Sequence, residues 1–117
     1  RSQGREEDAT KKWTTIAGDF ESAGAFSILV EGTVEPVARA VVESVKVPVI
    51  GIGASPACDG QVLVTEDILG LYPDLSPKFV KRYAEVGGVV SEAVDAYAKE
   101  VRAGEFPKLE HCFGVKR

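Results

Sequence analysis

The hydrophobic positions along the chain predict an alternation of helices and short strands. Over residues 5–23 the apolar side chains recur at helical spacing, and Gly24 can end that helix. The run AFSILV at residues 25–30 has the length of a buried strand. A clean apolar stripe over residues 34–45 predicts a second helix, which Thr33 is placed to cap.

The middle of the chain predicts two more strands around a loop. Residues 47–52, VPVIGI, are apolar on both faces, which suits a parallel sheet covered by helices. The small residues of GASPACDG at 53–60 predict a loop. A short third strand is expected at residues 61–64, and a short helical turn at residues 66–70.

Two helices are predicted in the last third of the chain. Ser76 and Pro77 are typical of a helix start and predict a helix to about residue 86, which Gly87-Gly88 should break. A further apolar stripe predicts a helix over residues 89–101. The predicted order α-β-α-β-β-α-α-α indicates an α/β fold with parallel strands. Because so small a sheet leaves two unpaired edges, we expect a partner or an assembly.

Composition excludes several classes of function. The 117 residues suffice for a single domain, residues 1–117, and 44% hydrophobic with 27% charged residues is ordinary for a globular protein. The net charge of −4 favours neither a nucleic-acid nor a membrane partner. The polar start of the chain is unlike a signal peptide, so a cytoplasmic location is expected. The two cysteines are far apart, which argues against a zinc site or disulfide framework and makes Cys58 a small packing residue.

Glu31 is the leading candidate for chemistry. It follows the predicted strand at 25–30 directly, and ligands of parallel α/β proteins bind at the carboxyl ends of strands. A carboxylate there can serve as a general base. The alternative is a residue that favours the amino-terminal dipole of the next helix.

The loop at residues 53–60 is the second candidate. Gly51 and Gly53 can let a ligand approach the backbone closely, although the same glycines fit a plain tight turn. Asp59 is either a ligand contact or a turn residue that bonds backbone. The remaining polar candidates each have a plainer interpretation: Glu66 and Asp67 as a solvated helix start rather than a metal site, and His111 as a surface residue rather than a site residue.

Five segments in order resemble the carboxyl-terminal half of the ketopantoate hydroxymethyltransferase family. They are EGTVEPVA, VPVIGIGA, DGQVLV, PKFVKRYAEVG and YAKEVRAGEFPKLEH. The resemblance implies the last three βα units of a (β/α)8 TIM-type barrel, followed by carboxyl-terminal helices. It also implies assembly into a homo-oligomer or pairing with a missing barrel half.

The resemblance further implies a reaction. The family transfers a hydroxymethyl group from 5,10-methylenetetrahydrofolate to the keto acid 3-methyl-2-oxobutanoate, which gives 2-dehydropantoate for pantothenate synthesis. Mg²⁺ binds the keto acid, and a glutamate that Glu31 matches acts as the base. The implied substrate-binding residues are Gly51, Gly53, Ser55 and Asp59.

Some positions depart from the family pattern. The segments that carry the two metal-binding aspartates and the substrate-contacting lysine and histidine have no counterpart in these residues, so no metal ligand is expected here. Ser55 stands where a glycine is usual, Glu66-Asp67 where His-Asp is usual, and Cys112 where a serine is usual. Two alternatives therefore stay open: a non-catalytic relative that assembles or binds a small ligand, and a related barrel enzyme that acts on small 2-keto acids.

Overall fold

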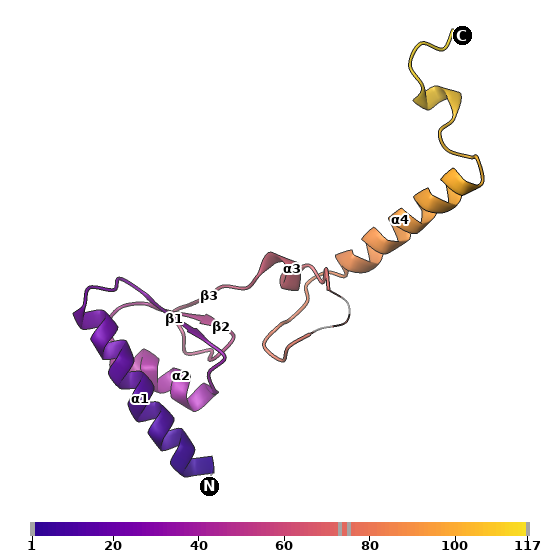
Figure 1. The fold of residues 1–117 in the computed structure, drawn as a ribbon. Helices are drawn as coiled ribbons and strands as arrows, with labels where there is room; N and C mark the ends of the chain where they lie inside the picture. The colour runs from indigo at the N-terminus through magenta and orange to yellow at the C-terminus, as the bar shows by residue number, and fades with distance from the viewer. Residues whose placement is uncertain (1, 73, 75, 117) are drawn as a thin grey trace. The chain divides into compact units, whose positions relative to one another are not determined.

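The structure is a computed structural model that describes residues 2–72, 74 and 76–116 (Figure 1). The chain forms two compact units. The first contains residues 1–64 and 77–81, and the second contains residues 65–76 and 82–117.

The first unit is an α/β layer built on a small parallel sheet. Its strands are β1 (Ile28–Glu31), β2 (Val49–Ile52) and β3 (Gly60–Gln61), in the order β1-β2-β3. Both neighbouring pairs are parallel, with Ile28 opposite Val49 and Gly51 opposite Gln61. The predicted α/β class and parallel pairing are confirmed.

Helices α1 (Ser2–Ser22) and α2 (Glu35–Ser44) pack against each other beneath the sheet (Figure 1). The helices predicted at 5–23 and 34–45 are thus confirmed within a few residues. The buried side chains shared by the strands and these helices form one core, made of Ala17, Ile28, Val30, Ala38, Val41 and Val49.

Only one face of the sheet is covered among the described residues. Along β1 the side chains alternate between buried and exposed, so that Ile28 and Val30 face the core while Leu29 stays 58% exposed. Ile50 and Ile52 of β2 are half-buried. The prediction of a sheet covered on both faces is therefore not met by these residues, because α1 and α2 lie on the same side of the sheet (Figure 1).

The third strand is shorter than predicted. It covers Gly60–Gln61 instead of residues 61–64. Val62 still donates a backbone hydrogen bond to the Gly51 carbonyl at 3.0 Å, but β2 ends at Ile52 and offers no further partner. The loop from β2 to β3 contains no helix, so the connection between these parallel strands is unusually short.

Thr33 does not cap α2 as predicted. The residue before the first helical turn is Val34, and no side chain caps it. The Thr33 hydroxyl instead donates to the Glu31 carbonyl at 3.1 Å, because that carbonyl lies two residues back in the tight turn after β1. Pro36 lies in the first helical turn, where its missing N–H costs little.

The second unit contains α3 (Thr65–Ile68), α4 (Val86–Arg102) and the short 3-10 helix η1 (Leu109–His111). The helix predicted from Pro77 to about residue 86 is wrong. Backbone N–H groups of Tyr83, Val86 and Gly87 donate to the carbonyls of residues 68–70, which replaces the bonds that a helix would need.

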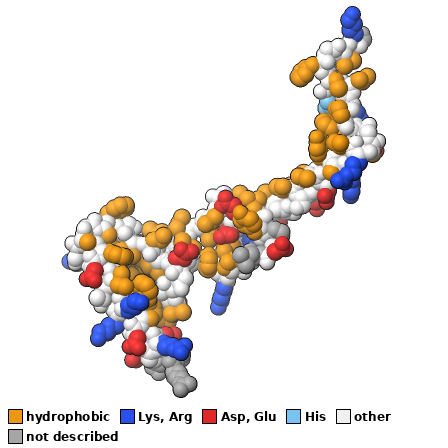
Figure 2. Space-filling view, viewed as in Figure 1, with side chains coloured by type: hydrophobic (Ala, Val, Ile, Leu, Met, Phe, Trp, Pro, Cys, Tyr) orange, Lys and Arg blue, Asp and Glu red, His pale blue; other side chains and the backbone are white. Residues whose placement is uncertain are grey.

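Gly87 and Gly88 do not break a helix either, because both lie in the first turn of α4. A Cβ added at Gly87 would lie 2.8 Å from the Gly70 carbonyl oxygen, so only glycine lets this turn approach the backbone of residues 70–71. The apolar stripe predicted over 89–101 does form a helix, but its side chains are exposed: Val89, Val90, Val94, Tyr97 and Val101. Figure 2 shows hydrophobic side chains on the surface of α4.

No helix among the described residues has the length and apolar character that crossing a membrane requires.

The two glycines of α4 make a matched pair of tests. We expect Gly87→Ala to destabilise the second unit by about 1–3 kcal/mol, because its methyl group would press on backbone that cannot yield easily. Gly88→Ala meets nothing within 4 Å and should stabilise the helix by about 0.5–1 kcal/mol. Urea unfolding followed by circular dichroism measures both, and equal effects of the two substitutions would contradict the close approach at Gly87.

Candidate functional site

A pocket of about 770 Å³ lies at the carboxyl ends of the strands in the first unit. The loops after β1 and β2 form most of its wall, and the segment 77–81 completes it. Its lining residues are Gly32, Thr33, Val34, Glu35, Ile52, Gly53, Ala54, Ser55, Pro56, Gln61, Lys78 and Phe79. This is the edge where parallel α/β proteins bind their ligands.

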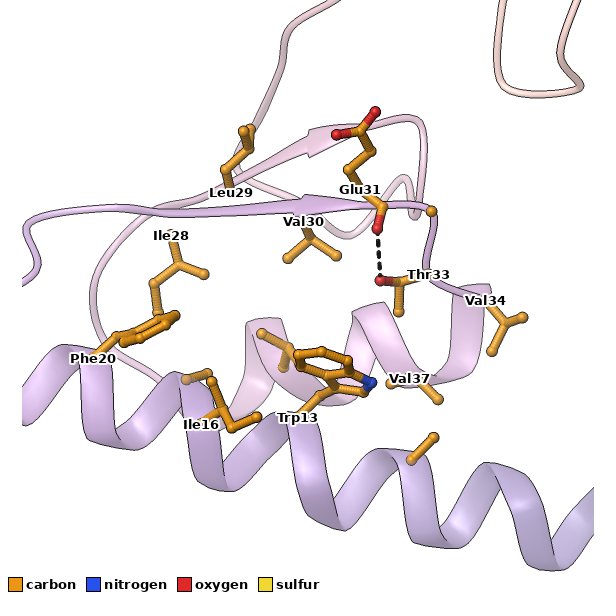
Figure 3. A pocket seen from close by; sticks show the side chains of 14 residues that line it. Trp13, Ile16, Phe20, Ile28, Leu29, Val30, Glu31, Thr33, Val34 and Val37 are labelled. Carbon is orange, nitrogen blue, oxygen red and sulfur yellow. Dashed lines mark hydrogen bonds between the residues drawn. The ribbon is translucent and has the colours of Figure 1, made fainter.

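Glu31 is the last residue of β1, and its side chain is exposed. Strand alternation places it on the same face as Leu29, away from α1 and α2 (Figure 3). No hydrogen bond or ion pair holds its carboxylate among the residues that the structure describes. The carboxylate is therefore free to receive a proton or a ligand.

A second pocket, of about 390 Å³, lies between α1 and β1. It is lined mainly by apolar side chains, including Trp13, Phe20 and Val34. Figure 3 shows the Glu31 carboxylate pointing away from this pocket, so Glu31 contributes its backbone to the wall. The pocket is mostly apolar, and Thr33 and Trp13 are the described side chains of its lining that could hydrogen-bond a ligand there.

The turn after β2 has an unusual backbone. Gly53 and Ala54 both have a φ of 63°, and Ala54 is the non-glycine residue with positive φ among those described. Side-chain bonds support this turn: the Gln61 amide donates to the carbonyls of Gly53 at 3.0 Å and of Ser55 at 3.2 Å. Left-handed backbone at an alanine costs free energy, and such strain is concentrated at functional sites.

Other atoms of this chain, and not a ligand, lie close to the backbone of Gly51 and Gly53. A Cβ added at Gly51 would lie 2.6 Å from the Gly53 carbonyl oxygen and 2.7 Å from Gln61 Nε2. A Cβ added at Gly53 would lie 2.7 Å from Phe79 Cβ. Gly53 lines the larger pocket, whereas the space beside Gly51 is filled by the loop after β2. Ligand contacts at these glycines stay predictions.

Asp59 is held at the other end of β2. Its Oδ2 accepts a hydrogen bond from the Val49 N–H at 2.8 Å, and its own N–H donates to the Val49 carbonyl at 2.9 Å. Since Val49 begins β2, this carboxylate does not line the pocket at the carboxyl ends. Its predicted contact with substrate has no support in this geometry and stays untested.

Glu35 is a residue of the site that the sequence interpretation missed. It opens α2 and lines the same pocket as Ser55, whose side chain is only 3% exposed. Arg39 Nε donates to Glu35 Oε1 at 3.0 Å. The Ser55 hydroxyl and, after it, the Arg39 guanidinium hold the pKa of Glu35 below its usual range. The i, i+4 spacing of Glu35 and Arg39 could have indicated the ion pair, but nothing in the sequence pairs Glu35 with Ser55.

The other candidates follow their plainer interpretations. Cys58 packs partly buried against the core, as a small filler would. Glu66 and Asp67 lie in the first turn of α3. His111 lies in the second unit, where its Nδ1 accepts a hydrogen bond from the Lys108 N–H at 3.1 Å. Within the described residues no group of three or more His, Cys, Asp or Glu side chains could hold a metal ion.

The parallel α/β layer has a pocket at its strand ends, and Gly32, the residue after Glu31, lines it. Enzymes of the α/β class bind their ligands in such pockets. The family model described as ketopantoate hydroxymethyltransferase matches residues 1–109. The chain therefore belongs to the ketopantoate hydroxymethyltransferase family, which is a family of transferases.

Curated relatives match the whole chain. It is 53% identical over 117 residues to 3-methyl-2-oxobutanoate hydroxymethyltransferase 1 of Hahella chejuensis, covering 100% of this chain and 42% of that protein. It is 55% identical over 117 residues to 3-methyl-2-oxobutanoate hydroxymethyltransferase of Sinorhizobium medicae, covering 100% of this chain and 43% of the relative. The chain thus spans less than half the length of these relatives.

Substitution of Asp59 can distinguish a structural role, the hydrogen bond to Val49, from a role in ligand binding. We expect Asp59→Ala to destabilise the first unit by about 1–3 kcal/mol, because the Val49 N–H loses a charged acceptor. Asp59→Asn keeps an acceptor oxygen and should cost less. Urea unfolding measures the difference, and a stable Asp59→Ala variant with weakened keto acid binding would instead indicate a ligand contact.

Proposed function

We propose that this chain is the Glu31-bearing part of an enzyme that makes 2-dehydropantoate. The enzyme would transfer a hydroxymethyl group from 5,10-methylenetetrahydrofolate to 3-methyl-2-oxobutanoate, as a step of pantothenate synthesis. The observation that carries the proposal is the 53–55% identity, over the whole chain, to relatives named for that transfer.

Glu31 is proposed as the general base. Its carboxylate stands at the carboxyl end of β1 with no partner among the described residues, so it can accept a proton from the carbon beside the ketone. Loss of that proton leaves an enolate, whose carbon forms the new bond to the one-carbon unit of the folate. Overall, one water is consumed and tetrahydrofolate is released.

Gly53 and Ser55 are proposed to contact the keto acid, because they lie in the wall of the pocket at the strand ends. Gly51 and Asp59 would act less directly. Gly51 makes room for the turn after β2, and Asp59 ties β2 to the end of that loop. Lys78 adds a positive charge to the same pocket, which favours a carboxylate substrate.

The donor set in the described residues does not fit Mg²⁺. Magnesium in proteins needs near-octahedral oxygen ligands, usually one or two carboxylates with water and substrate. Here Glu31 is the proposed base, Asp59 is bonded to β2 and Glu35 is bonded to Arg39, so these three residues leave no carboxylate for the metal. The magnesium and the folate that the resemblance implies would therefore be bound by residues outside this chain's described part, and no step is assigned to them.

We also propose that residues 1–117 form part of one (β/α)8 barrel domain. Leu29 is exposed, and Ile50 and Ile52 are half-buried on the sheet face opposite the helices, where a barrel would have its interior. The outer edge of β1 and that of β3 lack a strand partner among the described residues. Further strands, from the same protein or from a second copy in a homo-oligomer, would cover this face and the two edges.

Proton exchange in D2O tests the proposal without folate. The chain, alone and with the remaining part of a full-length relative, is mixed with magnesium and 3-methyl-2-oxobutanoate, and NMR follows loss of the C3 proton signal. We expect exchange above the metal-only rate that Glu31→Gln lowers about 10²- to 10⁴-fold, the range for loss of a general base. Glu43→Gln, an exposed carboxylate on α2, is the matched control and should leave the rate unchanged.

The alternative function is a non-catalytic relative that assembles or binds a small ligand. The incomplete donor set for magnesium is the observation that favours it. Exchange that is absent under both conditions, with folding and assembly intact, would support this alternative. Exchange that persists unchanged in Glu31→Gln would instead show that another residue is the base.

A further inference from the structure

Glu35 and Ser55 come from two successive connections at the carboxyl ends of the strands. Glu35 follows the turn after β1, and Ser55 lies in the turn after β2. Both residues line the same pocket. The Glu35 side chain is 42% exposed, but its Oε2 atom is buried and has no hydrogen-bond partner among the described residues. A buried carboxylate oxygen without a donor is costly, so a donor close to it is significant.

Ser55 can supply that donor. Its side chain is buried, and its Oγ accepts a hydrogen bond from the Ala57 N–H at 2.9 Å. A hydroxyl that accepts one bond still has its own hydrogen to donate, and that hydrogen rotates about the Cβ–Oγ bond. The Ser55 hydroxyl is also the largest cause of the lowered pKa of Glu35, as expected of a donor to the charged carboxylate.

We propose that Glu35 is a positioning residue that holds the loop after β2 through the Ser55 hydroxyl. In this arrangement Glu35 Oε2 accepts from Ser55 Oγ–H, and Ser55 Oγ accepts from Ala57 N–H. The chain of two hydrogen bonds joins the start of α2 to the left-handed turn at Gly53 and Ala54.

The turn needs support from outside because Ala54 is held at a positive φ. Gln61 supports it from the side of β3, through the carbonyls of Gly53 and Ser55. Glu35 supports it from the side of α2. The proposal deepens the proposed function, since this turn borders the pocket expected to receive the keto acid, but its test needs no catalysis.

Arg39 is the charged group that favours the ionised form of Glu35. Arg39, on the same helix, donates to Oε1, and Lys78 of the segment 77–81 lines the same pocket. At neutral pH the carboxylate therefore holds Ser55. As the pH falls through the lowered pKa of Glu35, protonation weakens the acceptor and releases the turn.

An NMR pH titration of the chain tests the coupling. We expect the amide signals of Ser55 and Ala57 to shift with the same midpoint as the Glu35 carboxyl carbon, below the ordinary range of a glutamate. Ser55→Ala should raise the midpoint of Glu35. Glu35→Ala should speed hydrogen exchange of the Ala57 amide about 2- to 10-fold, the range for loss of one supporting hydrogen bond.

Three further variants test whether these effects come from the Glu35–Ser55 hydrogen bond and not from a general change in charge. Glu35→Gln keeps an acceptor oxygen, so it should restore part of the protection at Ala57 while abolishing the pH dependence at Ser55. Glu43→Gln removes a charge from the exposed side of α2 and should change neither. Arg39→Gln should raise the midpoint of Glu35 and leave Ala57 protected, because Ser55 still donates.

The proposal is overturned if the Ser55 and Ala57 amides do not follow Glu35, or if Ser55→Ala leaves the Glu35 midpoint unchanged. Should Ser55→Ala fail to fold, Ser55→Gly replaces it, because glycine is the residue that the resemblance places there. An inactive protein that passes the titration would count against the proposed function alone.

Discussion

The burial of one face of the sheet against α1 and α2 determines the rest of the first unit. Val49 and Ala38 are fully buried where β2 meets α2, and burying a valine side chain stabilises a fold by about 1.5–3 kcal/mol. Because strand side chains alternate, burying Ile28 and Val30 forces Leu29 and Glu31 onto the opposite face. The orientation of the candidate base is thus a consequence of core packing.

The spacing of apolar residues predicted the elements that are determined by residues close together in the sequence. The stripes of α1 and α2 have their apolar residues at helical spacing, and both helices form. The position of Glu31 followed from the same reasoning, because a residue directly after an apolar run lies at a strand end. The parallel order of the strands followed from the alternation of helices and strands.

Features that depend on hydrogen bonds between residues far apart in the sequence could not be predicted. Pro77 has the local signature of a helix start, but the N–H groups of Tyr83, Val86 and Gly87 bond to residues 68–70 instead. Asp59 looks like a turn residue, and its actual partner, Val49, lies ten positions earlier. Glu35 and Ser55 are 20 residues apart in the sequence, and they line one pocket only once β1 and β2 are in register. In the first two cases a tertiary hydrogen bond outweighs a weak local preference.

The loop from β2 to β3 covers part of the core, which a crossover helix covers in most parallel sheets. Ala54 and Cys58 of this loop pack against the core, where a crossover helix would otherwise lie. Gln61 holds the beginning of the loop, and Asp59 holds its end. Most surface loops accept added residues readily. This one has a fixed length, since an insertion would detach the loop from one end of β2, which makes it a poor site for a tag or graft.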